Sequence, residues 1–187
     1  MTPYKTIAVC ASGPSLTRED CEAVIRAGIP VIAVNASWQR VPECTWVYAA
    51  DYRWWRKNVD LLPAGPQRWT CSKPASAEFN LNYFEPDYRG SFNSGLRATL
   101  FARQCGARTI ILLGFDCSIA SGSHWHGDHP ELGNPNQGTV KIWQKDFTYL
   151  AGFLKDSVTV INCSRESALT CFTRASLSKT LVDSDRR

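Results

Sequence analysis

The sequence predicts an α/β domain in which a mainly parallel sheet of about five to seven strands carries helices on both faces. Short apolar runs of strand length recur along the chain, and segments with helical periodicity separate them. A parallel connection needs a crossover long enough for a helix, so this alternation favours parallel pairing. With 187 residues and 44% hydrophobic content, the chain fits one domain. We therefore expect a single domain over residues 1–181 and a frayed tail over 182–187.

The first half of the chain begins with a buried strand at Thr6–Cys10, where every residue after the first is apolar or small. A turn containing Gly13 leads from it into a helix that stops at Gly28. The segment 72–92 holds Pro74, Pro86 and Gly90 and shows no sustained period, which predicts an excursion or lid. The other elements expected here are strands at Pro30–Asn35, Trp46–Ala50 and Arg68–Cys71 and a helix from Arg53 to Asp60.

The second half continues the alternation of strands and helices. An Asn or Ser is the expected N-cap of the helix that opens at Asn93. A long amphipathic helix follows later in the chain, and its periodicity predicts that Trp143 lies in the core. The elements are a helix from Asn93-Ser94-Gly95 to Gln104 or Cys105, a central strand at Thr109–Leu113, a helix over Gln137–Leu154, a strand at Val158–Asn162 and a short helix from Glu166.

Composition narrows the class of protein. The eight cysteines form no CxxC pair and several lie in apolar segments, so we expect buried free thiols in a reducing cytosol. The N-terminus lacks the zones of a secretory signal, and no apolar run is long enough to cross a bilayer, so we expect a cytoplasmic protein without a membrane span. The net charge of +4 allows an anionic ligand without demanding nucleic acid.

Small or hydrogen-bonding residues follow the predicted strands at their carboxyl ends. They are Gly13, Asn35, Asp51, Asp116 and Ser164. In an open parallel sheet, ligands bind beyond these ends, where the strand order reverses. A nucleotide fits such an edge: the Gly13-Pro14-Ser15 turn and the Asn93-Ser94-Gly95 helix start could hold phosphate, while the Asp and Asn side chains could contact ribose hydroxyls or a base edge.

All three histidines lie in one loop, Ser123-His124-Trp125-His126-Gly127-Asp128-His129-Pro130. Histidine changes charge near neutral pH, so three beside an aspartate are candidates for a proton relay or a metal cluster. The spacing His124-x-His126-x-Asp128-His129 also matches the HxHxDH signature of the metallo-β-lactamase-like hydrolases, whose zinc shell needs later histidines that this chain lacks. A catalytic zinc site with three histidines and a polar surface loop without function both stay open as alternatives.

Aromatic and cationic residues alternate in Tyr52-Arg53-Trp54-Trp55-Arg56-Lys57. Aromatic faces flanked by cations suit sugars, bases or single-stranded nucleic acid. Trp54 is therefore a candidate contact for substrate or acceptor, together with Trp125, His126 and Ser164. The alternative is a helix whose indoles pack on the sheet while its cations face solvent.

Five motifs occur in the order of the landmarks of bacterial lipooligosaccharide sialyltransferases, and together they span most of the chain. They are Gly13-Pro14-Ser15-Leu16, Asn93-Ser94-Gly95, Ile111-Leu-Leu-Gly-Phe-Asp116, Ser123-His124-Trp125 and Cys163-Ser-Arg-Glu-Ser-Ala-Leu169. The chain also resembles the Rossmann-like proteins with a GPSL turn that include the hydroxymethylpterin pyrophosphokinases. It is most similar to small phage and prophage proteins with an HWxGDHP loop.

This resemblance implies a nucleotide-binding transferase with one Rossmann-like domain. In the sialyltransferases, the matching positions surround a cytidine monophosphate sugar. They fall here on Ser12, Gly13, Asn35, Ser94, Gly114 and Asp116. A histidine of the later loop acts there as general base, and its position falls on Asp128, or on His129 with a one-residue gap. The family also has an Asn where Ser12 stands in this chain.

We therefore expect a glycosyltransferase-like enzyme that moves a sugar from a nucleotide-activated donor to a hydroxyl acceptor. His129 would be the base, with Asp128 or His124 as its partner. Helix N-termini can stabilise a departing phosphate, so no cofactor is required, although Mg²⁺ or Zn²⁺ stays open.

The acceptor could be a glycan, a modified DNA base or a metabolite, and a homo-oligomer is allowed; if the protein is phage-encoded, it would act in the host cytoplasm. One alternative is Mg²⁺-dependent phosphoryl or pyrophosphoryl transfer with Asp116 and Asp128 as ligands. The other is a non-catalytic module that binds a nucleotide or a nucleic-acid end.

Overall fold

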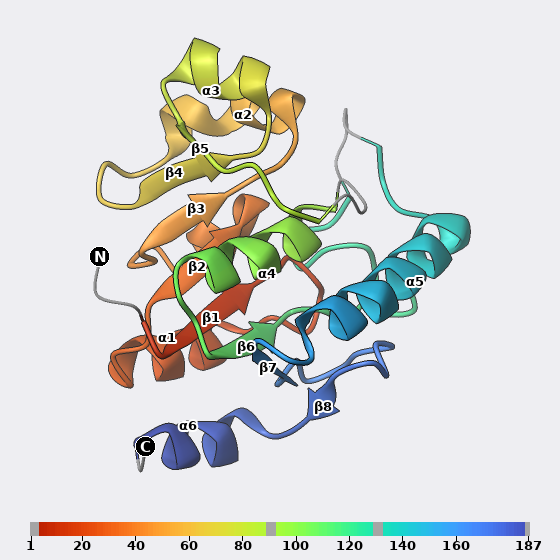
Figure 1. The fold of residues 1–187 in the computed structure, drawn as a ribbon. Helices are drawn as coiled ribbons and strands as arrows, with labels where there is room; N and C mark the ends of the chain where they lie inside the picture. Colours follow the sequence, from red (N-terminus) through yellow and green to blue (C-terminus); the bar gives the residue numbers. More distant parts are fainter. Residues whose placement is uncertain (1–3, 89–92, 129–132, 186–187) are drawn as a thin grey trace.

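A wholly parallel sheet of eight strands forms the centre of the structure, a computed structural model that describes residues 4–88, 93–128 and 133–185 (Figure 1). The strand order is β5-β4-β3-β2-β1-β6-β7-β8. The predicted α/β class is confirmed, and the sheet exceeds the expected size because two short strands extend its edges. The strands are β1 (Thr6–Cys10), β2 (Val31–Val34), β3 (Trp46–Tyr48), β4 (Gln67–Thr70), β5 (Asn82–Tyr83), β6 (Thr109–Leu113), β7 (Thr159–Asn162) and β8 (Thr173–Arg174).

Helices connect the strands and cover both faces of the sheet (Figure 1). Alternate residues of β1 point to opposite faces, as the two-residue period of a strand requires. Ile7 and Val9 pack with residues of α4 and α5, whereas Ala8 and Cys10 pack with residues of α1, α2 and α6. The helices are α1 (Arg18–Arg26), α2 (Tyr52–Asn58), α3 (Lys73–Phe79), α4 (Ser94–Gln104), α5 (Gln137–Leu154) and α6 (Leu177–Asp185), with 3₁₀ helices η1 (Asn35–Gln39) and η2 (Val59–Leu61).

The strand order reverses beside β1. From β1 the chain moves outward through β2, β3, β4 and β5, then returns through α4 to β6 on the other side of β1. Ala8 is in register with Val31 of β2 and with Ile111 of β6, so the carboxyl ends of these strands lie together. Such a reversal opens a crevice above the sheet, because the loops on its two sides diverge.

The fold differs from the sequence prediction in three segments. The expected excursion at 72–92 contains α3, capped by Ser72, and the edge strand β5. The expected tail from 182 begins inside α6, which continues to Asp185. No helix starts at Glu166: residues 163–172 form a loop, in which Ser164, Ser167 and Ala168 hydrogen-bond to the backbone of Phe115 and Asp116 after β6. Ser167 Oγ donates to the Phe115 carbonyl at 2.6 Å, for example.

None of the helices in the described ranges combines the length and the apolarity that crossing a membrane requires. All eight cysteines are free thiols, and Cys10, Cys21, Cys44 and Cys163 are buried. The expectation of buried free thiols therefore holds for these four. Burial raises the pKa of Cys44 to about 12, which keeps this thiol protonated at neutral pH.

Candidate functional site

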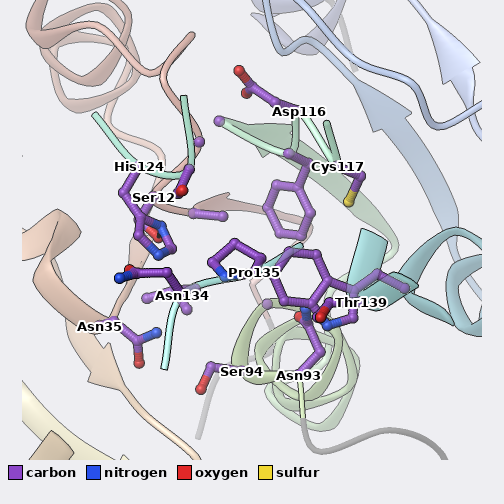
Figure 2. Close-up of a pocket in the computed structure, with 18 of the residues that line it drawn as sticks. Ser12, Asn35, Asn93, Ser94, Asp116, Cys117, His124, Asn134, Pro135 and Thr139 are labelled. Carbon is purple, nitrogen blue, oxygen red and sulfur yellow. Dashed lines mark hydrogen bonds between the residues drawn. The ribbon is translucent and has the colours of Figure 1, made fainter. Parts of the chain in front are cut away.

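A cavity of about 560 Å³ lies where the strand order reverses (Figure 2). Its walls come from the loops after β1, β2, β3 and β6 and from the N-terminal turns of α2, α4 and α5. The volume falls within the range of small-molecule sites, and the position is the one where open α/β sheets bind ligands. Of the predicted strand-end residues, Gly13, Asn35, Asp51 and Asp116 line this cavity together.

Asp116 joins the turn after β1 to the turn after β6. Its carboxylate accepts a hydrogen bond from Ser15 N at 2.8 Å and one from Ser15 Oγ at 2.5 Å. In Figure 2 the carboxylate points away from the middle of the cavity. Burial raises the pKa of Asp116, and the two bonds from Ser15 oppose that shift because they stabilise the charged form. Asp116 was predicted to contact a ligand. In this structure its carboxylate instead links the loops after β1 and β6 through Ser15.

Gly13 and Gly114 allow these two turns to approach each other. A Cβ added at Gly13 would overlap the Asp116 carboxylate and the Gly114 carbonyl. Gly114 has a φ of +70°, in the left-handed region that glycine adopts at little cost. Gly13 N donates to the Gly114 carbonyl at 2.9 Å, which completes the contact. Pro14 and Ser15 of the same turn lie outside the cavity wall.

Asn35 follows β2 in a left-handed conformation, with a φ of 51°. This region is unfavourable for most residues, and Asn tolerates it better than most. The side-chain oxygen is buried and finds no hydrogen-bond donor in the described part of the chain. A residue with an unfavourable backbone conformation in a cavity wall is a candidate ligand contact, because such conformations occur often at functional sites.

The N-terminus of α4 faces the cavity through Ser94 and Gly95. The expected cap was an Asn or a Ser, and Asn93 is the cap, with its side-chain oxygen 3.0 Å from Leu96 N. Ser94 Oγ accepts a hydrogen bond from Ala50 N at 3.0 Å, which ties α4 to the end of β3. The first backbone N–H groups of a helix have no helical acceptor and carry the positive end of the helix dipole. This wall of the cavity therefore favours an anion.

The basic aromatic segment forms α2, which Asp51 caps through Arg53 N and Trp54 N at 2.6 and 3.1 Å. The indoles of Trp54 and Trp55 are buried at 3% and 0% exposure, while Arg56 and its neighbour Lys57 face solvent. The packed-helix alternative therefore describes most of this segment. Trp54 and Arg53 also line the cavity, where Arg53 is an exposed cation at the wall.

The histidine loop meets the cavity through His124. Its Nδ1 lies 3.1 Å from Ser12 Oγ (Figure 2). Its ring stacks on that of His126, with the ring centroids 5.0 Å apart. Asp128 accepts a hydrogen bond from Ser123 Oγ at 2.7 Å and is exposed. Of the predicted catalytic residues, His124 lines the cavity and Asp128 does not, and His129 lies outside the described residues.

Three predicted substrate contacts lie outside the cavity wall. The ring of His126 stacks on that of His124, and Trp125 packs against the core on the sheet face covered by α1, α2 and α6. Ser164 is 3% exposed, and its Oγ accepts a hydrogen bond from Phe115 N at 2.8 Å. Ser164 therefore fixes the loop after β6, because its hydroxyl is committed to backbone. Within the described ranges, no three His, Cys, Asp or Glu side chains are grouped as a metal site requires.

An aromatic wall on the other side of the cavity was not predicted. Thr139, Trp143 and Phe147 follow each other at four-residue spacing on α5 and line the cavity, and Phe115 packs edge-on against Phe147 at 5.7 Å. The core prediction for Trp143 holds in part: the half-buried side chain packs against the core, and it also lines the cavity. Asn134 is another cavity residue that sequence reasoning missed.

The structure defines a Rossmann-like α/β protein with a cavity at the strand-order reversal. No family model and no curated protein matches the chain. Among solved structures, the MAf glycosyltransferase from Magnetospirillum magneticum AMB-1 is similar, with a TM-score of 0.67 and 12% identity. The match covers 98% of this chain and 36% of that chain, so this chain spans about a third of the neighbour's length. At this identity the likeness shows the fold: the chain has the α/β fold of a glycosyltransferase of known structure.

Proposed function

We propose that the protein is a glycosyltransferase-like enzyme, which transfers a sugar from a nucleotide-activated donor to a hydroxyl acceptor. The observation that carries this proposal is the composition of the cavity. One cavity combines the N-terminal turn of α4, which favours phosphate, with the His124 imidazole, which is held by Ser12. The shared fold with a glycosyltransferase supports the same class.

Different walls of the cavity suit different parts of a nucleotide donor. Its phosphate would lie at the Ser94-Gly95 start of α4, beside the Gly13 turn, where the first N–H groups of the helix and the helix dipole favour negative charge. A ribose hydroxyl or a base edge would contact the Asn35 side chain in the cavity wall. A flat base would find an aromatic face on Trp143.

His124 is the general base that the described residues support best, since it lines the cavity. In the proposed step the imidazole takes the proton of the acceptor hydroxyl, and the acceptor oxygen forms a bond to the anomeric carbon of the donor sugar. The bond between that carbon and the phosphate oxygen breaks, and the electron pair leaves with the nucleotide phosphate. The N-terminus of α4 would stabilise this departing charge, so the step requires no resident cofactor.

A nucleotide panel tests the proposal. Cytidine, uridine, guanosine and adenosine nucleotides are added to the purified wild-type protein and to the variant Ser94→Pro, and the melting temperatures are compared. The proline removes the first N–H group of α4, at a position where the helix geometry accepts proline. We expect one nucleotide to raise the melting temperature of the wild-type protein and not of the variant. The matching nucleotide sugar should then be turned over, and His124→Ala should abolish turnover while nucleotide binding persists.

Three results would reject the glycosyltransferase assignment. A strict Mg²⁺ requirement with a nucleoside triphosphate donor would instead support phosphoryl or pyrophosphoryl transfer. Nucleotide binding without turnover of any nucleotide sugar would support a binding module. The absence of any nucleotide effect on the melting temperature would remove the nucleotide site itself.

A further inference from the structure

His124 and Trp125, which are adjacent in the histidine loop, have different surroundings. His124 lines the cavity, whereas its neighbour Trp125 packs against the hydrophobic core on the face covered by α1 and α2. The Arg40 guanidinium lies over the Trp125 ring, 4.3 Å from its centroid. Trp125 Nε1 is buried and has no hydrogen-bond partner among the residues that the structure describes. Trp125 is therefore an anchor of the loop and not a wall of the substrate cavity.

Arg40 joins three segments that surround the site. It follows η1, directly after Gln39, and its own backbone N–H donates to Ser37 at 2.9 Å. Its Nη1 donates to the Leu16 carbonyl at 2.9 Å, in the turn that carries Ser12. The cation also covers the Trp125 ring, and a planar guanidinium suits such stacking on an aromatic face.

These contacts fix the backbone on both sides of the hydrogen bond between Ser12 and His124. Trp125 N donates to the Ser12 carbonyl at 3.0 Å, while Ser12 Oγ meets His124 Nδ1 at 3.1 Å. Two adjacent residues of the loop therefore contact the same residue of the β1 turn. If the indole lost its place against Arg40, both contacts would loosen together.

We infer that Arg40 and Trp125 are positioning residues, which act as a clamp that sets the His124 imidazole in the cavity. The reaction that His124 serves rests on the proposed function, whereas the clamp itself rests on the contacts above. Neither side chain lines the cavity, so their removal should affect the placement of the imidazole more than the affinity for the nucleotide. Displacement of a catalytic group by about 1 Å can cost on the order of a hundredfold in rate.

Four variants and one control test the clamp. Arg40→Ala and Trp125→Ala remove its two halves, whereas Arg40→Lys keeps the charge without the planar fork and Trp125→Phe keeps an aromatic face. Arg103→Ala is the matched control: Arg103 also covers an aromatic ring, that of Phe153 at 5.3 Å, but neither residue lines the cavity.

The first readout needs no substrate. NMR spectra of ¹⁵N-labelled imidazoles report the tautomer of His124 and its hydrogen bond to Ser12. We expect Arg40→Ala and Trp125→Ala to shift or broaden the His124 signals, Trp125→Phe to shift them less than Trp125→Ala, and Arg103→Ala to leave them unchanged. Wild-type His124 signals in both alanine variants would overturn the clamp.

The second readout is turnover of the nucleotide sugar identified by the panel. We expect about a ten- to hundredfold fall in kcat in the two alanine variants, with less than a twofold change in nucleotide Kd and partial recovery in the Lys and Phe variants. A parallel loss of kcat and nucleotide affinity would show a general structural role and overturn the inference. If the wild-type protein turns over no nucleotide sugar, the proposed function fails, and the NMR readout alone still decides the clamp.

Discussion

Substitution of Gly13 by Ala tests whether close approach of two turns builds the cavity. The added Cβ would overlap the Asp116 carboxylate and the Gly114 carbonyl. Neither atom can retreat freely, because Ser15 holds the carboxylate through two hydrogen bonds and Gly114 contributes backbone. The methyl group must therefore separate the loops after β1 and β6.

The expected loss of stability follows from these contacts. Forced overlap in a packed region typically costs about 1–3 kcal/mol. If the carboxylate also moves away from Ser15, the loss of hydrogen bonds to a charged group adds about 1.5–3 kcal/mol. Chemical denaturation of Gly13→Ala should thus show a free energy of unfolding lower than that of the wild-type protein by roughly 1–6 kcal/mol.

Gly65→Ala provides the control for this experiment. A Cβ at Gly65 meets no atom within 4 Å, and Gly65 is not among the glycines with positive φ. It should leave stability unchanged or raise it slightly, since alanine reduces the entropy of the unfolded chain. If Gly13→Ala unfolds at the same denaturant concentration as Gly65→Ala, the two turns do not depend on close contact and the reasoning is refuted.

Three further changes probe the site. Asp116→Asn tests the raised pKa of this carboxyl: because the folded form holds the proton more tightly than the unfolded chain, its contribution to stability is complete below the unfolded pKa and is lost as pH rises through the folded pKa. As pH falls from 7 to 4, the free energy of unfolding of the wild-type protein should therefore rise relative to that of Asp116→Asn. A relative fall over the same pH range would contradict the raised pKa. Asn35→Gly should leave the free energy of unfolding unchanged or higher, because glycine adopts a positive φ more easily and an unpaired buried oxygen is lost. Nucleotide affinity, measured by calorimetry, should fall about tenfold, and unchanged affinity would exclude Asn35 as a ligand contact. Trp143→Ala should weaken nucleotide binding by about tenfold or more through lost stacking, and a variant that binds normally but melts at a much lower temperature would show that Trp143 serves core packing alone.

Much of the fold could be predicted from the sequence, because strand and helix periods are local properties. The central strand was expected at Thr109–Leu113 and is β6 with the same bounds, and the long helix at Gln137–Leu154 is α5. The Asn93 cap was also expected, since an Asn before a helical pattern satisfies the first free N–H groups. The carboxyl ends of the strands share one edge of a parallel sheet, so the sequence already placed Gly13 and Asn35 near each other, and both line the cavity.

Only the tertiary structure decided what each side chain faces. The spacing of Trp143 and Phe147 on α5 is the same whether the helix covers the core or overhangs a cavity, so periodicity placed Trp143 in the core. The sequence did not indicate that Arg40 lies over the Trp125 indole, because the two residues are far apart along the chain. Likewise, no short pattern showed that Ser164 Oγ accepts a hydrogen bond from the backbone N–H of Phe115 in another loop. Local spacing determines which residues share a helix or strand, whereas the assignment of a face to core, cavity or anchor depends on long-range packing that no short pattern records.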